Sequence, residues 1–193
     1  MKTIRVAEYK YTGKPLNWAI SAWTGLFNPG TPRYSHTEIW IPDENGLFGG
    51  YDGHLHGGYE GQYFGECFTS TMRGDWNGTV IRPASEVLTH SRRWDYFELE
   101  VEDVDYKEAV HLARVAAANN DGYDSPGLVS FFLPIRFGSG TKDICSEVAL
   151  DFLRWCGIFT KDKMPSPRRL AAWIMQLGFK PIPLLSDSNR YHF

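Results

Sequence analysis

The order of two hydrophobic patterns constrains the fold of this chain more than any other feature. The first half contains short stretches in which apolar and polar residues alternate, as in β-strands with one buried face. Two longer stretches of helical periodicity follow, over residues 105–119 and 144–156. Because the strand patterns mostly precede the helix patterns, the sequence predicts an α+β fold rather than a series of βαβ units.

The predicted strands share alternating apolar side chains and are bounded by turn-forming residues. They cover residues 4–11, 35–41, 63–71, 78–82 and 95–101. A short helix is predicted over residues 15–23, where apolar residues recur at helical spacing, and residues 42–46 have the composition of a turn. The glycine-rich stretch 49–65 is predicted to be a loop insertion.

The ends of the predicted helices carry typical capping residues. Asp105 and Glu108 have the spacing of a capping box at the start of the first long helix. Gly157 stands where the second long helix needs a residue in the left-handed conformation. Ser166 and Pro167 are typical of the N-cap and the first residue of a third helix.

Length, charge and hydropathy limit the classes of function. The chain has 193 residues, which suits a single domain over 1–193. Its net charge of −3 gives no basic surface for nucleic acid, which we therefore do not expect as a partner. No apolar stretch reaches the roughly 20 residues of a membrane span, and the first residues lack the apolar segment of a secretory signal. We therefore expect no transmembrane segment and a cytoplasmic location.

The three cysteines differ in their predicted surroundings, and in a reducing cytoplasm all are expected to be free thiols. Cys145 stands near the start of the second long helix, where the helix dipole favours a thiolate and free backbone N–H groups can meet an oxyanion. Cys156 lies at the other end of that helix among apolar residues, and Cys67 lies in an aromatic strand. The sequence therefore predicts that Cys145 is the reactive thiol and that the other two are packing residues.

Among the six histidines, His36 is the best placed to act as a base for Cys145. It lies on a predicted strand, and Glu38, two residues later, points to the same side, where it can orient the imidazole. The alternative is that His36 is an ordinary surface residue of an amphipathic strand. His54 and His56 form a pair with metal-ligand spacing, but their glycine-rich surroundings favour a solvated loop, so neither a metal nor a cofactor is predicted.

Two segments carry a family resemblance: Ser35-His36-Thr37-Glu38-Ile39 and Ile144-Cys145-Ser146-Glu147. They are similar to the two motifs of circularly permuted NlpC-type papain-like cysteine hydrolases, the YiiX-like branch found in bacteria and tailed phages. In papain and ordinary NlpC enzymes the cysteine precedes the histidine, whereas here His36 precedes Cys145, as in the permuted order. Shorter resemblances follow in the family's order over most of the chain, at residues 68–74, 78–83, 94–99, 122–124 and 166–170.

This resemblance implies a permuted papain-like fold, in which a small antiparallel sheet or partial barrel packs on helices and the nucleophile lies at a helix N-terminus. It implies that Cys145 is the nucleophile, His36 its base and Glu38 the third polar member. Three residues in or near the matching motifs are predicted to support the site: Ser35, Tyr123 and Ser146. Because the family varies its third residue, polar side chains of the neighbouring strand are alternatives to Glu38: Glu66, Ser70 and Thr71.

Three hypotheses about function follow. The first is a cysteine-dependent amide or peptide hydrolase that works through a thioester, with cell-wall peptides as substrates and Trp40, Tyr59 and Tyr63 in the binding groove. The second is a lipid or acyl thioesterase or acyltransferase, because related permuted proteins include lipid-acting members. The third is a catalytically silent binding or virion-associated module. A phage-encoded chain is expected in the host cytoplasm or the virion.

Overall fold

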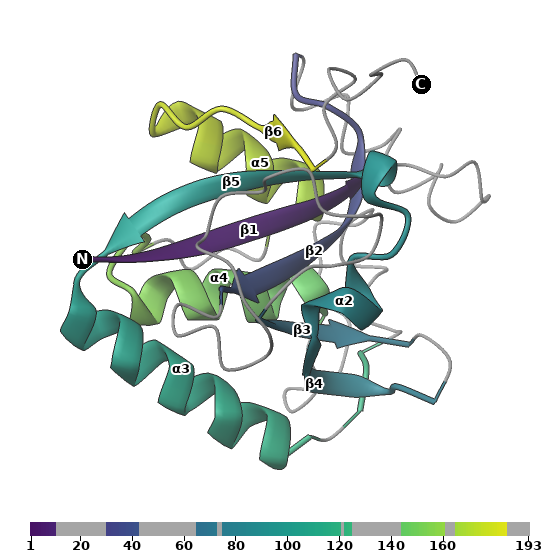
Figure 1. Cartoon of the computed structure of the whole chain (residues 1–193), viewed down its shortest axis with the longest axis vertical. Coiled ribbons are helices and arrows are strands. Elements are labelled where there is room, and N and C mark those ends of the chain that lie inside the picture. The colour runs from purple at the N-terminus through teal and green to yellow at the C-terminus, as the bar shows by residue number, and fades with distance from the viewer. Residues whose placement is uncertain are drawn as a thin grey trace, which may run out of the picture.

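The computed structural model describes residues 1–10, 30–42, 65–72, 75–120, 122–124, 144–160 and 165–184. Its centre is a six-stranded antiparallel sheet with the strand order β4-β3-β2-β1-β5-β6. Helices pack against this sheet (Figure 1), so the predicted α+β class is confirmed. The predicted helix 15–23 and most of the predicted turn 42–46 and loop 49–65 lie outside the described residues.

The strands follow the predicted alternation closely. Their bounds are Lys2–Lys10 for β1, Tyr34–Ile41 for β2, Glu66–Thr71 for β3, Gly78–Pro83 for β4, Trp94–Val101 for β5 and Ile182–Pro183 for β6. Strand β1 lies in the middle of the sheet and pairs with β2 on one side and β5 on the other. Strand β6 is not predicted by the sequence, because two exposed residues carry no alternation.

Three longer helices and two short ones belong to the described part of the chain. Their bounds are Ala84–Val87 for α2, Ser91–Arg93 for the 3₁₀ helix η1, Asp103–Ala118 for α3, Cys145–Trp155 for α4 and Pro167–Gln176 for α5. The predicted ends of α4 and α5 are confirmed. Gly157 follows α4 with a φ of +71°, and the Ser166 side chain accepts the backbone N–H of Arg169 at 3.3 Å.

The predicted capping box at the start of α3 is wrong. The helix begins at Asp103, directly after an extended Glu102 that provides no side-chain cap. Asp105 therefore lies inside the first turn instead of before it. The earlier start is favoured by acidic side chains near the positive end of the helix dipole and by an ion pair between Asp103 and Lys107 one turn later.

The sheet carries an apolar core on each face. On the face covered by α3, α4 and α5, Ile4 and Val6 of β1 pack with Phe152 and Leu170. On the opposite face a smaller core contains Ala7 of β1 together with side chains from α2 and β5. Because both faces are covered, the middle of β1 is buried, and it contains a carboxyl group, Glu8, that is 0% exposed.

Helix α4 is fixed to the sheet by its apolar face. It packs against β2 and β3, and the rings of Phe68 on β3 and Phe152 on α4 lie 6.0 Å apart. The same packing holds α4 beside β2 (Figure 1), and the first residue of the helix, Cys145, interacts with His36 of that strand. None of the helices in the described part of the chain has the length and hydropathy that a membrane span requires.

Candidate active site

Cys145 is the first residue of α4 and is 4% exposed. The residue before it, Ile144, is extended and contributes no side-chain cap. Its carbonyl accepts the first hydrogen bonds of the helix, from Glu147 and Val148 at 3.0 and 3.1 Å, so the backbone N–H groups of Cys145 and Ser146 precede the helical ladder. The thiol therefore lies at the positive end of a helix whose apolar face holds it in place.

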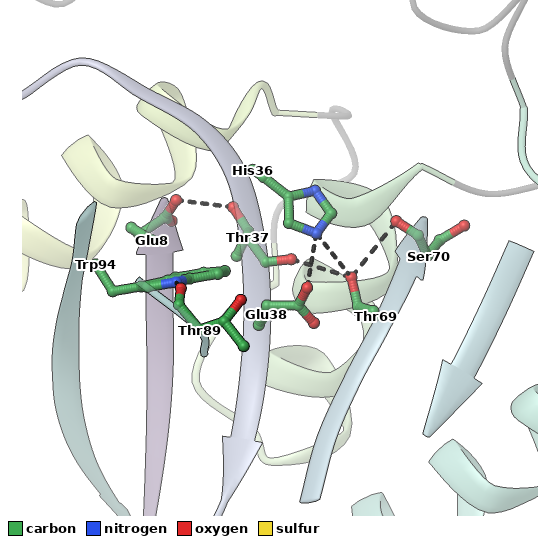
Figure 2. Close-up of polar contacts among 8 residues, drawn as sticks. All are labelled: Glu8, His36, Thr37, Glu38, Thr69, Ser70, Thr89 and Trp94. Carbon is green, nitrogen blue, oxygen red and sulfur yellow. Dashed lines mark hydrogen bonds and ion pairs between the residues drawn. The ribbon is translucent and has the colours of Figure 1, made fainter. Parts of the chain in front are cut away.

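The structure brings His36 of β2 to this thiol. The imidazole forms a hydrogen bond with the Cys145 side chain. Its Nε2 atom lies 2.7 Å from Oε1 of Glu38, as Figure 2 shows. Glu38 is 3% exposed. The three residues that the sequence predicts as nucleophile, base and third member thus form one continuous chain of contacts.

The charge state of His36 is set by opposing effects. Burial alone lowers the pKa of the imidazole, but the Cys145 thiolate and the Glu38 carboxylate, both hydrogen-bonded to the ring, raise it well above its usual value. Both neighbours therefore favour the protonated form of the imidazole.

Thr69 of β3 is a neighbour of His36 that the sequence analysis misses. Its Oγ1 atom donates to the carbonyl of Thr37 at 3.2 Å and lies 3.5 Å from His36 Nε2 (Figure 2). Of the alternatives to Glu38 on this strand, Glu66 lies at the far end and pairs with Arg114 at 2.6 Å. Ser70 and Thr71 are buried beside Thr69. Strand alternation alone does not identify Thr69, because its position depends on the register between β2 and β3.

The three predicted supporting residues have different surroundings. Ser35 precedes His36, and its buried hydroxyl has no hydrogen-bond partner in the described part of the chain. Ser146 is fully buried and donates to the carbonyl of Pro165 at 2.6 Å, so it ties the start of α4 to the residues just before α5. Tyr123 is within electrostatic range of the thiol, since burial and then the Cys145 charge raise its pKa.

Two asparagines hold the segment with Tyr123 against the sheet. Oδ1 of Asn120 accepts the backbone N–H groups of Thr79 at 2.9 Å and Gly122 at 3.0 Å, and its Nδ2 donates to the Asn77 carbonyl at 2.8 Å. Oδ1 of Asn77 in turn accepts the backbone N–H of Tyr123 at 3.2 Å. We call this set of contacts the asparagine clasp. It fixes the backbone of Tyr123 by hydrogen bonds that cross between distant parts of the sequence.

Glu8 is a second residue that sequence reasoning misses. It lies on β1 opposite Thr37 and is 0% exposed. Its Oε2 accepts the Thr37 hydroxyl at 2.9 Å (Figure 2), whereas Oε1 is buried without a hydrogen-bond partner in the described residues. The signal was present in the sequence: alternation puts Glu8 on the same face as Ile4 and Val6, where an apolar residue is expected.

The other two cysteines occupy different surroundings, as predicted. Cys67 is fully buried in the smaller core, and burial, followed by the Glu38 charge, raises its pKa well above the usual value. Cys156 is buried at the end of α4, where burial and Asp105 raise its pKa to about 12. Both sites favour the uncharged thiol, so their role as packing residues is confirmed.

Trp40 corrects one expectation about the groove. It is 2% exposed and lies under the guanidinium of Arg5, whose carbon is 4.6 Å from the ring centroid. The Tyr96 ring contacts it edge-on at 6.0 Å. Trp40 is therefore a core residue, because alternation along β2 turns it into the smaller core. Tyr59 and Tyr63 lie outside the described residues.

Comparisons with protein-family models, with curated proteins and with solved structures found no match to this chain. Within the ranges that the structure describes, no group of three or more His, Cys, Asp or Glu side chains is arranged to hold a metal ion. His54 and His56 lie outside those ranges. The chemistry of the site must therefore be argued from its own residues.

Proposed function

We propose that this chain is a cysteine-dependent amide or peptide hydrolase of the permuted papain-like type, with Cys145 as nucleophile, His36 as base and Glu38 as the residue that orients His36. The observation that carries the proposal is the continuous contact from the thiol at the start of α4, through the imidazole, to a buried carboxylate 2.7 Å from its far nitrogen. Nucleophile, base and orienting acid in this order are the requirements for covalent catalysis by a thiol.

The reaction begins with proton transfer from Sγ of Cys145 to His36. The thiolate attacks the substrate carbonyl, a C–S bond forms, and the carbonyl electron pair moves to oxygen. When this tetrahedral intermediate collapses, the C–N bond breaks and His36 gives its proton to the leaving amine. His36 then takes a proton from water as the water oxygen attacks the thioester carbonyl. The C–S bond breaks, the acid leaves, and His36 returns its proton to Sγ of Cys145.

The start of α4 supports the charged intermediate. The backbone N–H groups of Cys145 and Ser146 precede the first helical hydrogen bond, and the helix dipole favours negative charge there. Ser146 keeps this end in place through its bond to the Pro165 carbonyl, so the donors do not need to reorganise as the oxyanion forms.

The family resemblance adds a substrate class to this proposal. Papain-like enzymes of the NlpC type suggest small cell-wall peptides as substrates, whereas lipid-acting members of the permuted branch suggest acyl esters or thioesters. Both reactions use the same thioester intermediate, so the two classes are separated by supplying purified wall peptides and acyl esters to the same protein. A silent binding module has no need for a thiol, an imidazole and a carboxylate in this order.

The test is selective alkylation of Cys145. Iodoacetamide at slightly acidic pH is expected to label Cys145 at least tenfold faster than Cys67 and Cys156, because of the three thiols only this one lies at a helix start beside an imidazole. Cys145→Ala should lose both rapid labelling and turnover of any substrate, while Cys156→Ala, the matched control on the same helix, keeps both. Labelling of Cys145 at the rate of an ordinary thiol would contradict the proposal.

A further inference from the structure

Glu8 needs an explanation that packing does not supply. It is a carboxyl group with 0% exposure in the central strand, on the face where Ile4 and Val6 enter the main core. An apolar side chain there would avoid the cost of desolvating an acid. Residues that break the local pattern in this way are expected at functional sites, and Glu8 lies on the strand that pairs with the His36 strand.

The surroundings of Glu8 do not support a negative charge. Its only hydrogen bond in the described part of the chain is the one from Thr37, and its Oε1 atom is buried without a partner. Asp95 lies opposite Glu8 on the neighbouring strand β5. It forms an ion pair with Lys10, whose Nζ lies 2.7 Å from Asp95 Oδ1. Tyr34 also donates its hydroxyl to Asp95, at 2.9 Å. Lys10 and the Tyr34 hydroxyl thus both pair with Asp95 rather than with Glu8.

The charged groups around Glu8 also favour its neutral form. The groups that face it are Asp95 from β5, His36, Thr37 and Tyr34 from β2, and Cys145 from α4. Burial, the Cys145 thiolate and Asp95 raise the pKa of Glu8, against the lowering effects of the Thr37 hydrogen bond and the His36 charge, and the result is well above the usual value.

A short chain of contacts connects Glu8 to the base. Glu8 accepts from the Thr37 hydroxyl at 2.9 Å, the Thr37 carbonyl accepts from Thr69 at 3.2 Å, and Thr69 lies 3.5 Å from His36 Nε2. Figure 2 shows these residues side by side across three strands. Glu8 therefore reaches the imidazole through Thr37 and Thr69 and does not contact it as an acid or base.

We infer that Glu8 is a positioning residue that works as a neutral carboxylic acid: it holds Thr37, and through Thr69 the His36 imidazole, without placing a further negative charge near the Cys145 thiolate. The inference rests on the proposed function, since the position of His36 matters for the chemistry of Cys145. It adds a residue from β1 to the machinery of the site.

The first arm of the test measures the charge of Glu8 without any substrate. A neutral Glu8 means that the folded protein holds a proton that the unfolded chain loses above about pH 4.5. The folding equilibrium constant of the wild type should therefore fall relative to that of Glu8→Gln by up to about tenfold per pH unit above this value. Glu100→Gln, an exposed carboxyl on β5, should follow the wild type. If the folding equilibrium constants of the wild type and Glu8→Gln changed with pH in parallel, the inference would be overturned.

The second arm measures positioning by the rate of iodoacetamide labelling at Cys145. Glu8→Leu and Thr37→Val each break the Glu8–Thr37 hydrogen bond and are expected to slow labelling at neutral pH several-fold, whereas Glu8→Gln keeps an acceptor and restores the rate. Thr37→Val keeps the shape of the side chain, so it carries the test if Glu8→Leu does not fold. Wild-type rates in both variants would show that Glu8 positions nothing.

The two arms separate this inference from the proposed function. If the wild-type thiol reacts no faster than an ordinary cysteine, the hydrolase proposal fails, while the unfolding curves still report whether Glu8 is neutral. If the thiol reacts fast but the stabilities of the wild type and Glu8→Gln change with pH in parallel, the hydrolase proposal stands and the role inferred for Glu8 is wrong.

Discussion

At the scale of single residues, the site depends on charge as much as on shape. Glu38 lies 2.7 Å from His36 Nε2, and after Cys145 it is the main influence that raises the pKa of the partly exposed imidazole. Glutamine at this position would keep a hydrogen-bond acceptor of the same size but remove the charge. The variant therefore separates the orienting role of Glu38 from its electrostatic role.

We expect Glu38→Gln to lower the pKa of His36, because the charge that favours the imidazolium is removed. An imidazolium is present below its pKa and is lost as pH rises through it, so the protonated imidazole should disappear at lower pH than in the wild type. NMR titration of the His36 ring measures this directly. Glu66→Gln, which removes a surface ion pair on the neighbouring strand, is the control and should leave the His36 titration unchanged. Equal His36 titrations in Glu38→Gln and the wild type would mean that Glu38 acts through geometry alone.

The sequence identifies the residues of the site that lie in one element and misses those that require strand register. Glu38 follows His36 at the spacing of one strand face, and Cys145 opens a periodic helix, so local patterns suffice for all three. Thr69 and Glu8 lie on two other strands, and their contacts with β2 depend on pairings that no local pattern specifies.

At the scale of secondary structure, periodicity predicts the long elements and fails for the short ones. The five longer strands and the helices α3, α4 and α5 each carry enough repeats to be recognised. Helix α2 has four residues, η1 three and β6 two, so none of them completes a pattern. The asparagine clasp is also beyond local prediction, because it joins the turn before β4 to a segment more than forty positions later.

Gly78 is the element-scale test of that clasp. It has a φ of +97°, and a Cβ atom there would lie 1.9 Å from Oδ1 of Asn120 and 2.6 Å from the Gly122 Cα. Gly78→Ala therefore combines a left-handed backbone with a clash and should lower the free energy of unfolding by about 2–4 kcal/mol. Gly178→Ala is matched, since Gly178 has the same φ of +97° but no atom within 4 Å of the Cβ position, and it should cost only about 1 kcal/mol. Chemical denaturation measures the free energy of unfolding of both variants. Equal losses would mean that the asparagine clasp rearranges at little cost in stability.

At the scale of the whole molecule, α4 joins the stability of the fold to the proposed chemistry. Its later turns bury Phe152 and Leu153 in the main core, while its first residue is the thiol beside His36. Rigid secondary structure positions a reactive group more exactly than a loop does, because its packing locks the side chain. The helix is held at its start by the bond from Ser146 to the Pro165 carbonyl and further along by the packing of Phe152 against Phe68.

Because the start and the later turns of α4 have separate anchors, we expect mutations along this helix to change the stability of the fold and the reactivity of Cys145 separately. Phe152→Leu shortens a fully buried ring and should lower the free energy of unfolding by about 1–2 kcal/mol. The labelling rate of Cys145 should stay at the wild-type value at temperatures where the variant is folded, because the helix start has its own anchor. Cys145→Ala should show the reverse, with labelling lost and stability nearly kept. If Phe152→Leu slowed labelling while still fully folded, the core would be setting the position of the thiol, and the two ends of α4 would have to be treated as a single unit.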